Sequence, residues 1–375
     1  MREELRQAKR VIVKVGTSSL THANGRINID KMEVLVRQIC NLANAGKEMI
    51  LVSSGATAAG LPSLGFTSRP DDIALKQAAA SVGQGILLHM YEKLFAEYGH
   101  TVGQILVTRE DTVKRSHYLN LRNTLTALIG LGVIPIINEN DVVAIDEFKI
   151  GDNDTLSANI ASIIDADALI ILSDIEGLYT ANPSTDPNAT LIHEVETLTP
   201  YIYEISGGAG SSLGTGGMYT KIQAAHIATN SGVHMVIASG DHPDSIKAIM
   251  NGEERGTHFW PHRDVPQIKK RWMAFGTRLQ GTIYVDKGCR DALLTNGSSI
   301  LPVGILSGEG QFEEGDTISI VHDGEEIARG IVNFNLSDLL KIKGHKSQDI
   351  PSILGVRDTY HVVVHRDNLV VLRQE

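Results

Sequence analysis

The sequence predicts an α/β fold: a three-layer αβα sandwich with a mostly parallel sheet, followed by a small β-rich domain. Through the first two thirds of the chain, short apolar runs alternate with helix-like stretches. Strands that are apolar throughout and separated by helices are typical of a sheet covered on both faces. Beyond Gly281 the pattern changes to short strands separated by glycine-containing turns, which indicates a separate β-rich unit.

The predicted strands of the first block are apolar runs that end in glycine or polar residues. They span residues 11–15, 49–52, 102–107, 133–137, 168–172 and 233–238. Asp30 with Glu33 predicts a capping box at the start of the first long helix, because the residues that follow are apolar at helical spacing. The short strands predicted beyond Gly281 span residues 283–285, 317–321, 327–332 and 362–364.

The change of pattern sets the predicted domain boundaries. A chain of 375 residues is long enough for one large α/β domain and a smaller one. The segment 258–271 carries two prolines and a basic run and is typical of a linker. We therefore expect a first domain at residues 1–258, a linker at 259–280 and a β-rich domain at 281–375.

Composition argues against several classes of protein. The formal net charge is -10, from 34 Lys and Arg against 44 Asp and Glu, which is a poor match for nucleic acid or an anionic membrane. Cys40 and Cys289 form no CxxC pair, which argues against a disulfide framework and a zinc site. His258 and His262 are separated by Pro261 and have no Glu or Cys partner, so we expect no protein-bound metal. Without a signal-peptide core or a run of about 20 apolar residues, we expect a cytoplasmic enzyme and no membrane segment.

Polar or glycine-containing clusters follow four of the predicted strands at the point where each strand ends. They occupy residues 53–55, 138–141, 173–174 and 239–240. Ligands of open α/β sheets bind beyond the carboxyl ends of the strands. Four such clusters at one edge therefore predict a binding site there.

Two further polar segments each lead into a predicted helix. In residues 151–157, Asp and Asn either cap the helix or contribute to a site. Residues 214–221 form a glycine-rich loop that places Lys221 one turn inside a helix. Glycine lets the backbone approach a phosphate, and a helix N-terminus presents N–H groups to an anion. Because neither GxxxxGK[ST] nor GxGxxG is present, we expect a nucleotide site of a different kind.

Together these segments resemble the amino acid kinase family. The motifs that carry the resemblance are residues 13–18, 52–56, 135–141, 151–154 and 214–221. The likeness runs over essentially the whole chain, and residues 281–358 resemble a PUA domain, a small pseudo-barrel. Ser53 stands where Thr is common in the family and Tyr219 where Ser is common, and neither departure removes a catalytic group.

Within that family, the chain is most similar to members that use ATP to phosphorylate the side-chain carboxylate of glutamate, giving L-glutamyl 5-phosphate in the first step of proline biosynthesis. The resemblance implies that Lys14 contacts the transferred phosphoryl group, that Lys221 stabilises the ATP phosphates, and that Asp154 orients both lysines. Glutamate would be held by Ser54, Gly55, Asp141 and Asn153. The ATP-binding residues would be Lys14, Ser173, Asp174, Thr215, Gly216, Gly217, Met218, Tyr219, Thr220 and Lys221. Feedback inhibition by proline and a homo-oligomer, either dimer or tetramer, are also implied.

The chemistry of this reaction agrees with those residue types. The glutamate side chain has a reference pKa near 4.3, so it is already an anionic nucleophile at neutral pH and needs no general base. Catalysis then depends on positioning and on stabilising charge at the phosphoryl oxygens. Two lysines, the backbone N–H groups beside Gly16 and Gly55, and Mg²⁺ carried on the ATP phosphates suit that task.

Two alternative functions stay open at this point. A related kinase could act on another small acid or phosphate, such as acetylglutamate, aspartate or a nucleoside monophosphate. A PUA-like domain could instead bind RNA, but residues 281–375 hold nine Lys and Arg against fourteen Asp and Glu, and RNA-binding surfaces are usually basic. The one local basic candidate is the cluster Lys341, Lys343, His345 and Lys346. We therefore expect a structural or regulatory role for this domain.

Overall fold

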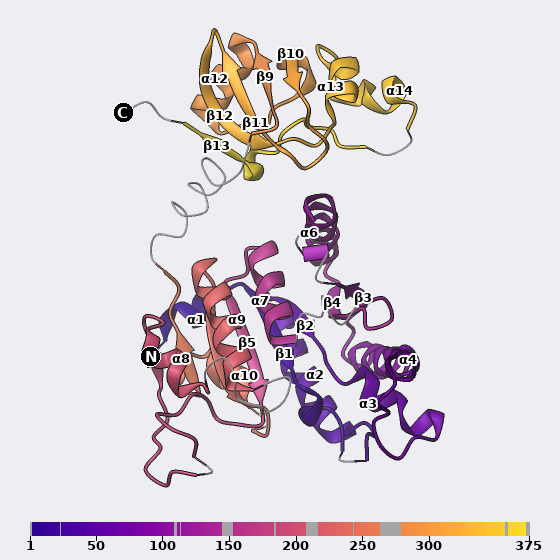
Figure 1. Cartoon of the computed structure of the whole chain (residues 1–375), viewed down its shortest axis with the longest axis vertical. Coiled ribbons are helices and arrows are strands. Elements are labelled where there is room, and N and C mark those ends of the chain that lie inside the picture. The colour runs from indigo at the N-terminus through magenta and orange to yellow at the C-terminus, as the bar shows by residue number, and fades with distance from the viewer. Residues whose placement is uncertain are drawn as a thin grey trace. The chain divides into compact units, whose positions relative to one another are not determined.

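The computed structural model describes residues 2–22, 24–108, 111–112, 114–144, 153–183, 185–207, 217–242, 244–262, 279–356 and 359–372. The chain divides into two compact units, Met1–Arg263 and Asp264–Glu375 (Figure 1). Each unit has its own sheet and its own apolar core. Among the described residues, no helix combines the length and the apolar character that crossing a bilayer requires.

The sheet of the first unit has the strand order β3-β4-β2-β1-β5-β7-β8-β6. Its strands are β1 Arg10–Val15, β2 Glu48–Val52, β3 Val102–Val107, β4 Ile134–Glu139, β5 Ala168–Ser173, β6 Glu194–Val195, β7 His234–Ser239 and β8 Thr257–Phe259. Strand β1 pairs in parallel with both β2 and β5, so it lies at the centre of the sheet. All pairs are parallel except β7 with β8. The sheet is therefore mixed at one edge and parallel where its central strands end.

Alternate residues of β1 face opposite layers of helices. Val11 and Val13 belong to one core cluster, which includes residues of α2 (Ile29–Asn44), α4 (Ile73–Glu97) and α10 (Ser245–Met250). Ile12 belongs to the other cluster, which includes residues of α6 (Arg115–Gly130), α7 (Asn153–Ile163), α8 (Pro200–Ile205) and α9 (Met218–Asn230). Successive side chains of a strand point to opposite faces, so the sheet is covered on both sides. The predicted three-layer fold is confirmed.

Three local features differ from the sequence-based expectation. Helix α2 is capped by Asn28, whose side-chain oxygen accepts from the Lys31 backbone N–H at 3.1 Å, so the expected capping box of Asp30 and Glu33 is wrong. Strands β6 and β8 are only two and three residues long and were not predicted. Phe259, the first residue of the expected linker, is fully buried in the core of the first unit.

A close glycine contact joins the short helix α3 (Ala56–Gly60) to α4. A methyl group on Gly60 would overlap the carbonyl oxygen of Ala79, and one on Gly83 would overlap the carbonyl oxygen of Ala56. Only residues without a β-carbon allow backbones to come so close. Helix α3 is therefore held directly against the middle of α4.

The second unit contains a five-stranded sheet in the order β10-β9-β11-β12-β13. Its strands are β9 Gly281–Val285, β10 Ile305–Gly310, β11 Thr317–His322, β12 Glu325–Ile331 and β13 Leu369–Val371, and its helices are α12 Lys287–Asn296, α13 Leu336–Ile342 and α14 Ile350–Leu354. Strands β9 and β11 pair in parallel and the other pairs are antiparallel. The strand expected at residues 362–364 is a single bridge between Val364 and Ile300.

Candidate active site

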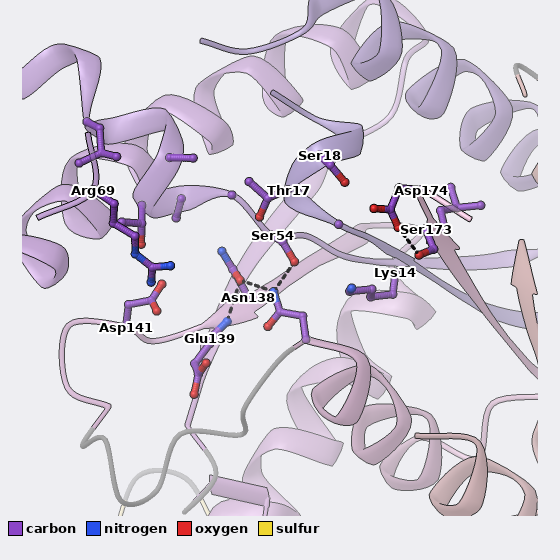
Figure 2. A pocket seen from close by; sticks show the side chains of 18 of the residues that line it. Lys14, Thr17, Ser18, Ser54, Arg69, Asn138, Glu139, Asp141, Ser173 and Asp174 are labelled. Carbon is purple, nitrogen blue, oxygen red and sulfur yellow. Dashed lines mark hydrogen bonds between the residues drawn. The ribbon is translucent and has the colours of Figure 1, made fainter. Parts of the chain in front are cut away.

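A cavity of about 600 Å³ lies at the carboxyl ends of the central strands of the first unit (Figure 2). Its walls include residues at or just beyond the ends of β1, β2, β4 and β5, together with residues from the starts of α7 and α9. Strand β1 lies between β2 and β5 in the sheet. The chain continues from β1 to β2 on one side, and it later adds β5 on the other side. Such a reversal of strand order is where α/β sheets open a crevice for ligands.

Three charged side chains meet at the floor of this cavity. The Lys14 Nζ lies 2.5 Å from Asp154 Oδ1, and the Lys221 Nζ donates to Asp154 Oδ2 at 3.1 Å. The side chain of Asp154 is fully buried, and those of Lys14 and Lys221 are 8% and 7% exposed. The two ammonium groups therefore share one carboxylate at the boundary between the core and the cavity.

Elementary strand and helix geometry brings these three groups together. Lys14 follows Ile12 by two residues, so it faces the same layer, which contains α7 and α9. Asp154 lies in the first turn of α7 and Lys221 in the first turn of α9, and the two helices pack against each other. Thr220 adds a hydroxyl that donates to Asp154 Oδ2 at 3.3 Å. Both helix N-termini, which attract anions, thus meet at the end of β1.

The trio carries a surplus of positive charge. Two lysines and one aspartate meet in a nearly buried place, where a charge is costly unless it is paired. An anion entering the cavity would be attracted by the two ammonium groups. The arrangement is therefore suited to a phosphoryl group approaching a carboxylate.

A hydrogen-bond network forms the middle of the cavity and is centred on Asn153. Its Nδ2 lies 2.6 Å from the Ser53 carbonyl oxygen, 2.8 Å from Ser54 Oγ and 2.9 Å from Asn138 Oδ1. The Glu139 backbone N–H also donates to Asn138 Oδ1, at 2.9 Å. The start of α7 thereby fixes the loop that follows β2 and the last two residues of β4.

Helix α4 also hydrogen-bonds to the loop after β2 and to the end of β4. The Tyr91 hydroxyl lies 2.9 Å from Ser53 Oγ, and Gln84 Nε2 donates to the Glu139 carbonyl oxygen at 3.3 Å. Tyr91 is almost completely buried, and this burial raises the pKa of its hydroxyl. These two residues are seven apart, so they lie on one face of the helix. Residues on this face hydrogen-bond to segments of the cavity wall, but they do not line the cavity themselves.

The two ends of the cavity differ in character. Figure 2 shows Lys14, Ser173 and Asp174 on one side of Ser54 and Asn138, and the Ser173 hydroxyl donates to Asp174 Oδ1 at 3.0 Å. On the other side, the guanidinium group of Arg69 points toward the carboxylate of Asp141. The lysine end suits phosphates, and the Arg69 end suits a ligand that carries both charges.

The structure brings most of the sequence-predicted residues to this cavity. The predicted residues among those lining it are Lys14, Ser54, Gly55, Asp141, Asn153, Ser173, Asp174 and Lys221. Asp154 lies beneath it as the partner of the lysines, and Gly217, Met218, Tyr219 and Thr220 lie at the start of α9. Thr215 and Gly216 lie outside the described residues, as do Gly151 and Asp152 of the second motif. The roles given to all of these residues are still predictions.

Sequence reasoning missed three groups of this site. Asn138 lies in a polar cluster that the sequence did single out, but no role was given to it. Arg69 lies in the loop before α4, where no local pattern indicates a ligand. Gln84 and Tyr91 were given no role, and only their polar tips connect them to the site.

Histidines outside the cavity form a structural cluster. His258 is fully buried, and its Nε2 lies 3.0 Å from Nδ1 of His234. Trp260 packs on His258 with ring centroids 4.7 Å apart. Burial, followed by the charges of His234 and Arg2, lowers the pKa of His258 to about 3. Within the described part of the chain, no group of three or more His, Cys, Asp or Glu side chains could hold a metal ion.

Comparison with known proteins gives the family. The amino acid kinase family model matches residues 9–239, and the PUA domain model matches residues 281–354. The glutamate 5-kinase of Moorella thermoacetica is 50% identical over 369 residues, which cover 98% of this chain and 97% of that protein. The glutamate 5-kinase of Caldanaerobacter subterraneus subsp. tengcongensis is 51% identical over 366 residues, 97% of this chain and 98% of that protein. The chain therefore belongs to the amino acid kinase family and, within it, to the glutamate 5-kinases.

Proposed function

We propose that this chain transfers the γ-phosphoryl group of ATP to the γ-carboxylate of L-glutamate, giving L-glutamyl 5-phosphate and ADP, as the first step of proline biosynthesis. The observation that carries the proposal is the pairing of Lys14 and Lys221 with one buried carboxylate at the floor of a 600 Å³ cavity. The identity of about half of all residues to glutamate 5-kinases over nearly the whole chain supports it.

The two lysines act on the phosphoryl group. A γ-carboxylate oxygen of glutamate attacks the γ-phosphorus of ATP, and the bond from that phosphorus to the bridging oxygen breaks as ADP leaves. Lys14, at the end of β1, neutralises charge on the transferred oxygens, and Lys221 does so on the ATP phosphates. Asp154 holds both ammonium groups in place and removes no proton, because the nucleophile is already ionised.

Substrates bind at the two ends of the cavity. Ser54, Gly55, Asp141 and Asn153 hold glutamate, and the network centred on Asn153 keeps the loop after β2 in position. Ser173, Asp174 and residues 215–221 bind ATP. The N-terminus of α9 supports this assignment, because the N–H groups at the start of a helix favour phosphate.

Magnesium fits this site as an ion carried by ATP. Mg²⁺ keeps several waters and commonly binds through phosphates and only one or two carboxylates. Asp174 lines the lysine end and can supply one such group, while no cage of three side chains is found among the described residues. Bound there, the ion would neutralise charge on the phosphate oxygens. The chain's own lysines supply the remaining positive charge.

Four wider properties belong to the same proposal. We propose proline as a feedback inhibitor, a homo-oligomer (dimer or tetramer) and a cytoplasmic location, as the resemblance to the family implies. We also propose a kinase domain at residues 1–258, a linker at 259–280 and a PUA-like domain at 281–375, with Phe259 packed in the kinase core.

The function is tested by ADP release from Mg-ATP across the free amino acids, with and without proline, together with trapping of the acyl phosphate by hydroxylamine. We expect turnover and hydroxamate formation with L-glutamate and far less with aspartate or acetylglutamate. Phosphorylation of a different small acid in preference to glutamate would overturn the proposal.

A further inference from the structure

We infer that Arg69 binds the α-carboxylate of the amino acid substrate and so sets the specificity of the cavity for an amino acid. This inference rests on the proposed function, because it takes glutamate as the substrate. It concerns a residue in the loop between the 3₁₀ turn Pro62–Leu64 and α4.

The charges of the cavity wall are divided between its ends. Among the described residues that line it, three side chains are cationic: Lys14, Arg69 and Lys221. Two of these three pair with Asp154 beneath the lysine end. Arg69 is thus the cation that lines the opposite end, where Figure 2 shows its guanidinium pointing toward Asp141.

Glutamate has three charged groups, and each needs a complementary partner. Its γ-carboxylate must reach the two lysines, which places its α-carbon at the other end of the cavity. An α-ammonium there requires an anion, which the proposed glutamate ligand Asp141 would supply, and an α-carboxylate requires a cation. A guanidinium presents a planar fork of donors that matches a carboxylate in two hydrogen bonds. Arg69 beside Asp141 therefore offers a matched pair of charges for the α-carbon substituents.

Exposure of Arg69 agrees with this role. The residue is exposed, at the mouth of the cavity. A long charged side chain in water gains little from a single surface ion pair. Arg has five N–H donors, so the guanidinium that points toward Asp141 can also bind a carboxylate. A substrate carboxylate can use two of those donors.

The test is a comparison of Arg69→Met, Arg69→Lys and the control Lys93→Met, which removes an exposed cation of α4 outside the cavity lining. Loss of a charge-assisted hydrogen bond predicts that Arg69→Met raises the KM for glutamate on the order of tenfold to a hundredfold. The KM for ATP should be unchanged, Arg69→Lys should recover part of the loss, and Lys93→Met should match the parent.

A second substrate separates direct contact from an indirect effect. Glutamate α-amide keeps the γ-carboxylate and the α-ammonium but lacks the α-carboxylate charge. Its KM, or its Ki as a competitive inhibitor where turnover is slow, should be the same for the parent and Arg69→Met. A KM of Arg69→Met for glutamate within twofold of the parent value would overturn the inference. An equal rise in the KM for glutamate and in the KM or Ki for its α-amide would overturn it as well. If the parent itself makes no acyl phosphate from glutamate, the proposed function fails instead.

Discussion

At the scale of single residues, the site depends on an ion group with unequal charge. Asp154 forms ion pairs with two ammonium groups at 2.5 and 3.1 Å, and all three side chains are nearly out of contact with solvent. Replacing one lysine still leaves the other paired with Asp154, so the buried carboxylate keeps a cationic partner. Each lysine should therefore matter more for the reaction than for the stability of the fold.

Replacement of Lys14 by Met tests this expectation. We expect kcat to fall by at least about a hundredfold, comparable to the loss of one donor that stabilises transition-state charge, while the folded structure persists because Lys221 still pairs with Asp154. Acyl-phosphate formation and the melting temperature are the measurements. Lys9→Met is the control, since that side chain is 70% exposed. Activity of Lys14→Met within a few-fold of the parent would contradict the assignment.

His258 predicts a loss of stability in acid. Its pKa is about 3 in the folded protein, against an ordinary value of 6.5. Between these two pH values the unfolded chain is protonated at this histidine and the folded chain is not. The contribution of neutral His258 to the free energy of unfolding is therefore complete above about pH 6.5 and decreases as the pH falls toward 3. As the pH falls from about 6.5 to 3, we expect the free energy of unfolding to decline less steeply in the His258→Gln variant than in the parent protein. Urea titrations followed by Trp260 fluorescence, in a Trp272→Phe background, measure the slopes; equal slopes would contradict the prediction.

At the scale of elements, helix α4 positions several segments that form the cavity wall. Its Gly83 touches the backbone of α3, and its Gln84 and Tyr91 bond the loops after β4 and β2. Ala56 of α3 itself lines the cavity. One helix thus holds three parts of the cavity wall without contributing a lining residue of its own.

The pair Gly83→Ala and Gly85→Ala tests the contact between α3 and α4. A methyl group at position 83 would overlap the Ala56 carbonyl oxygen, whereas nothing lies within 4 Å of one at position 85 of the same helix. We expect Gly83→Ala to destabilise the fold by about 1–3 kcal/mol and to raise the KM for glutamate. Gly85→Ala should be neutral or stabilising by up to about 1 kcal/mol, because alanine favours helices. Melting temperatures and KM values for glutamate are the measurements. Similar effects of the two substitutions would refute the role of the contact between α3 and α4.

Sequence patterns predicted elements well where they had a clear period. The apolar runs at residues 11–15, 49–52 and 168–172 predicted the central strands, and polar residues after them indicated the cavity. Strands β6 and β8 have too few residues for any period to show. The cap of α2 was misassigned because Asn28 and Asp30 are both good capping residues two positions apart. Arg69 was missed because only tertiary folding brings its loop to Asp141.

At the scale of the whole molecule, the two units are separately built. Among the described residues, the core clusters of the first unit end at Phe259 and the cluster of the second unit starts at Ile283. Every described residue that lines the cavity belongs to the first unit. Folding and chemistry of the kinase part can therefore be examined without the PUA domain.

A fragment of residues 1–262 is expected to fold and to phosphorylate glutamate. Its core clusters are complete, and a separate core is the usual sign of a domain that folds alone. We expect kcat per chain within a few-fold of the full-length value and a cooperative melting transition. Circular dichroism and acyl-phosphate trapping provide the measurements, and an unfolded or inactive fragment would show that the PUA domain is required.

The meeting of Lys14, Asp154 and Lys221 also bears on the order of synthesis. A nascent chain exposes the first ammonium group early, and its carboxylate follows only after some 140 further residues. The second ammonium group is translated last, well past the midpoint of the chain, on a helix that must then dock beside α7. With the roles proposed for the two lysines, phosphoryl transfer on the ribosome would begin only after α9 has left the exit tunnel, and chains that end before α9 should not use ATP in this reaction.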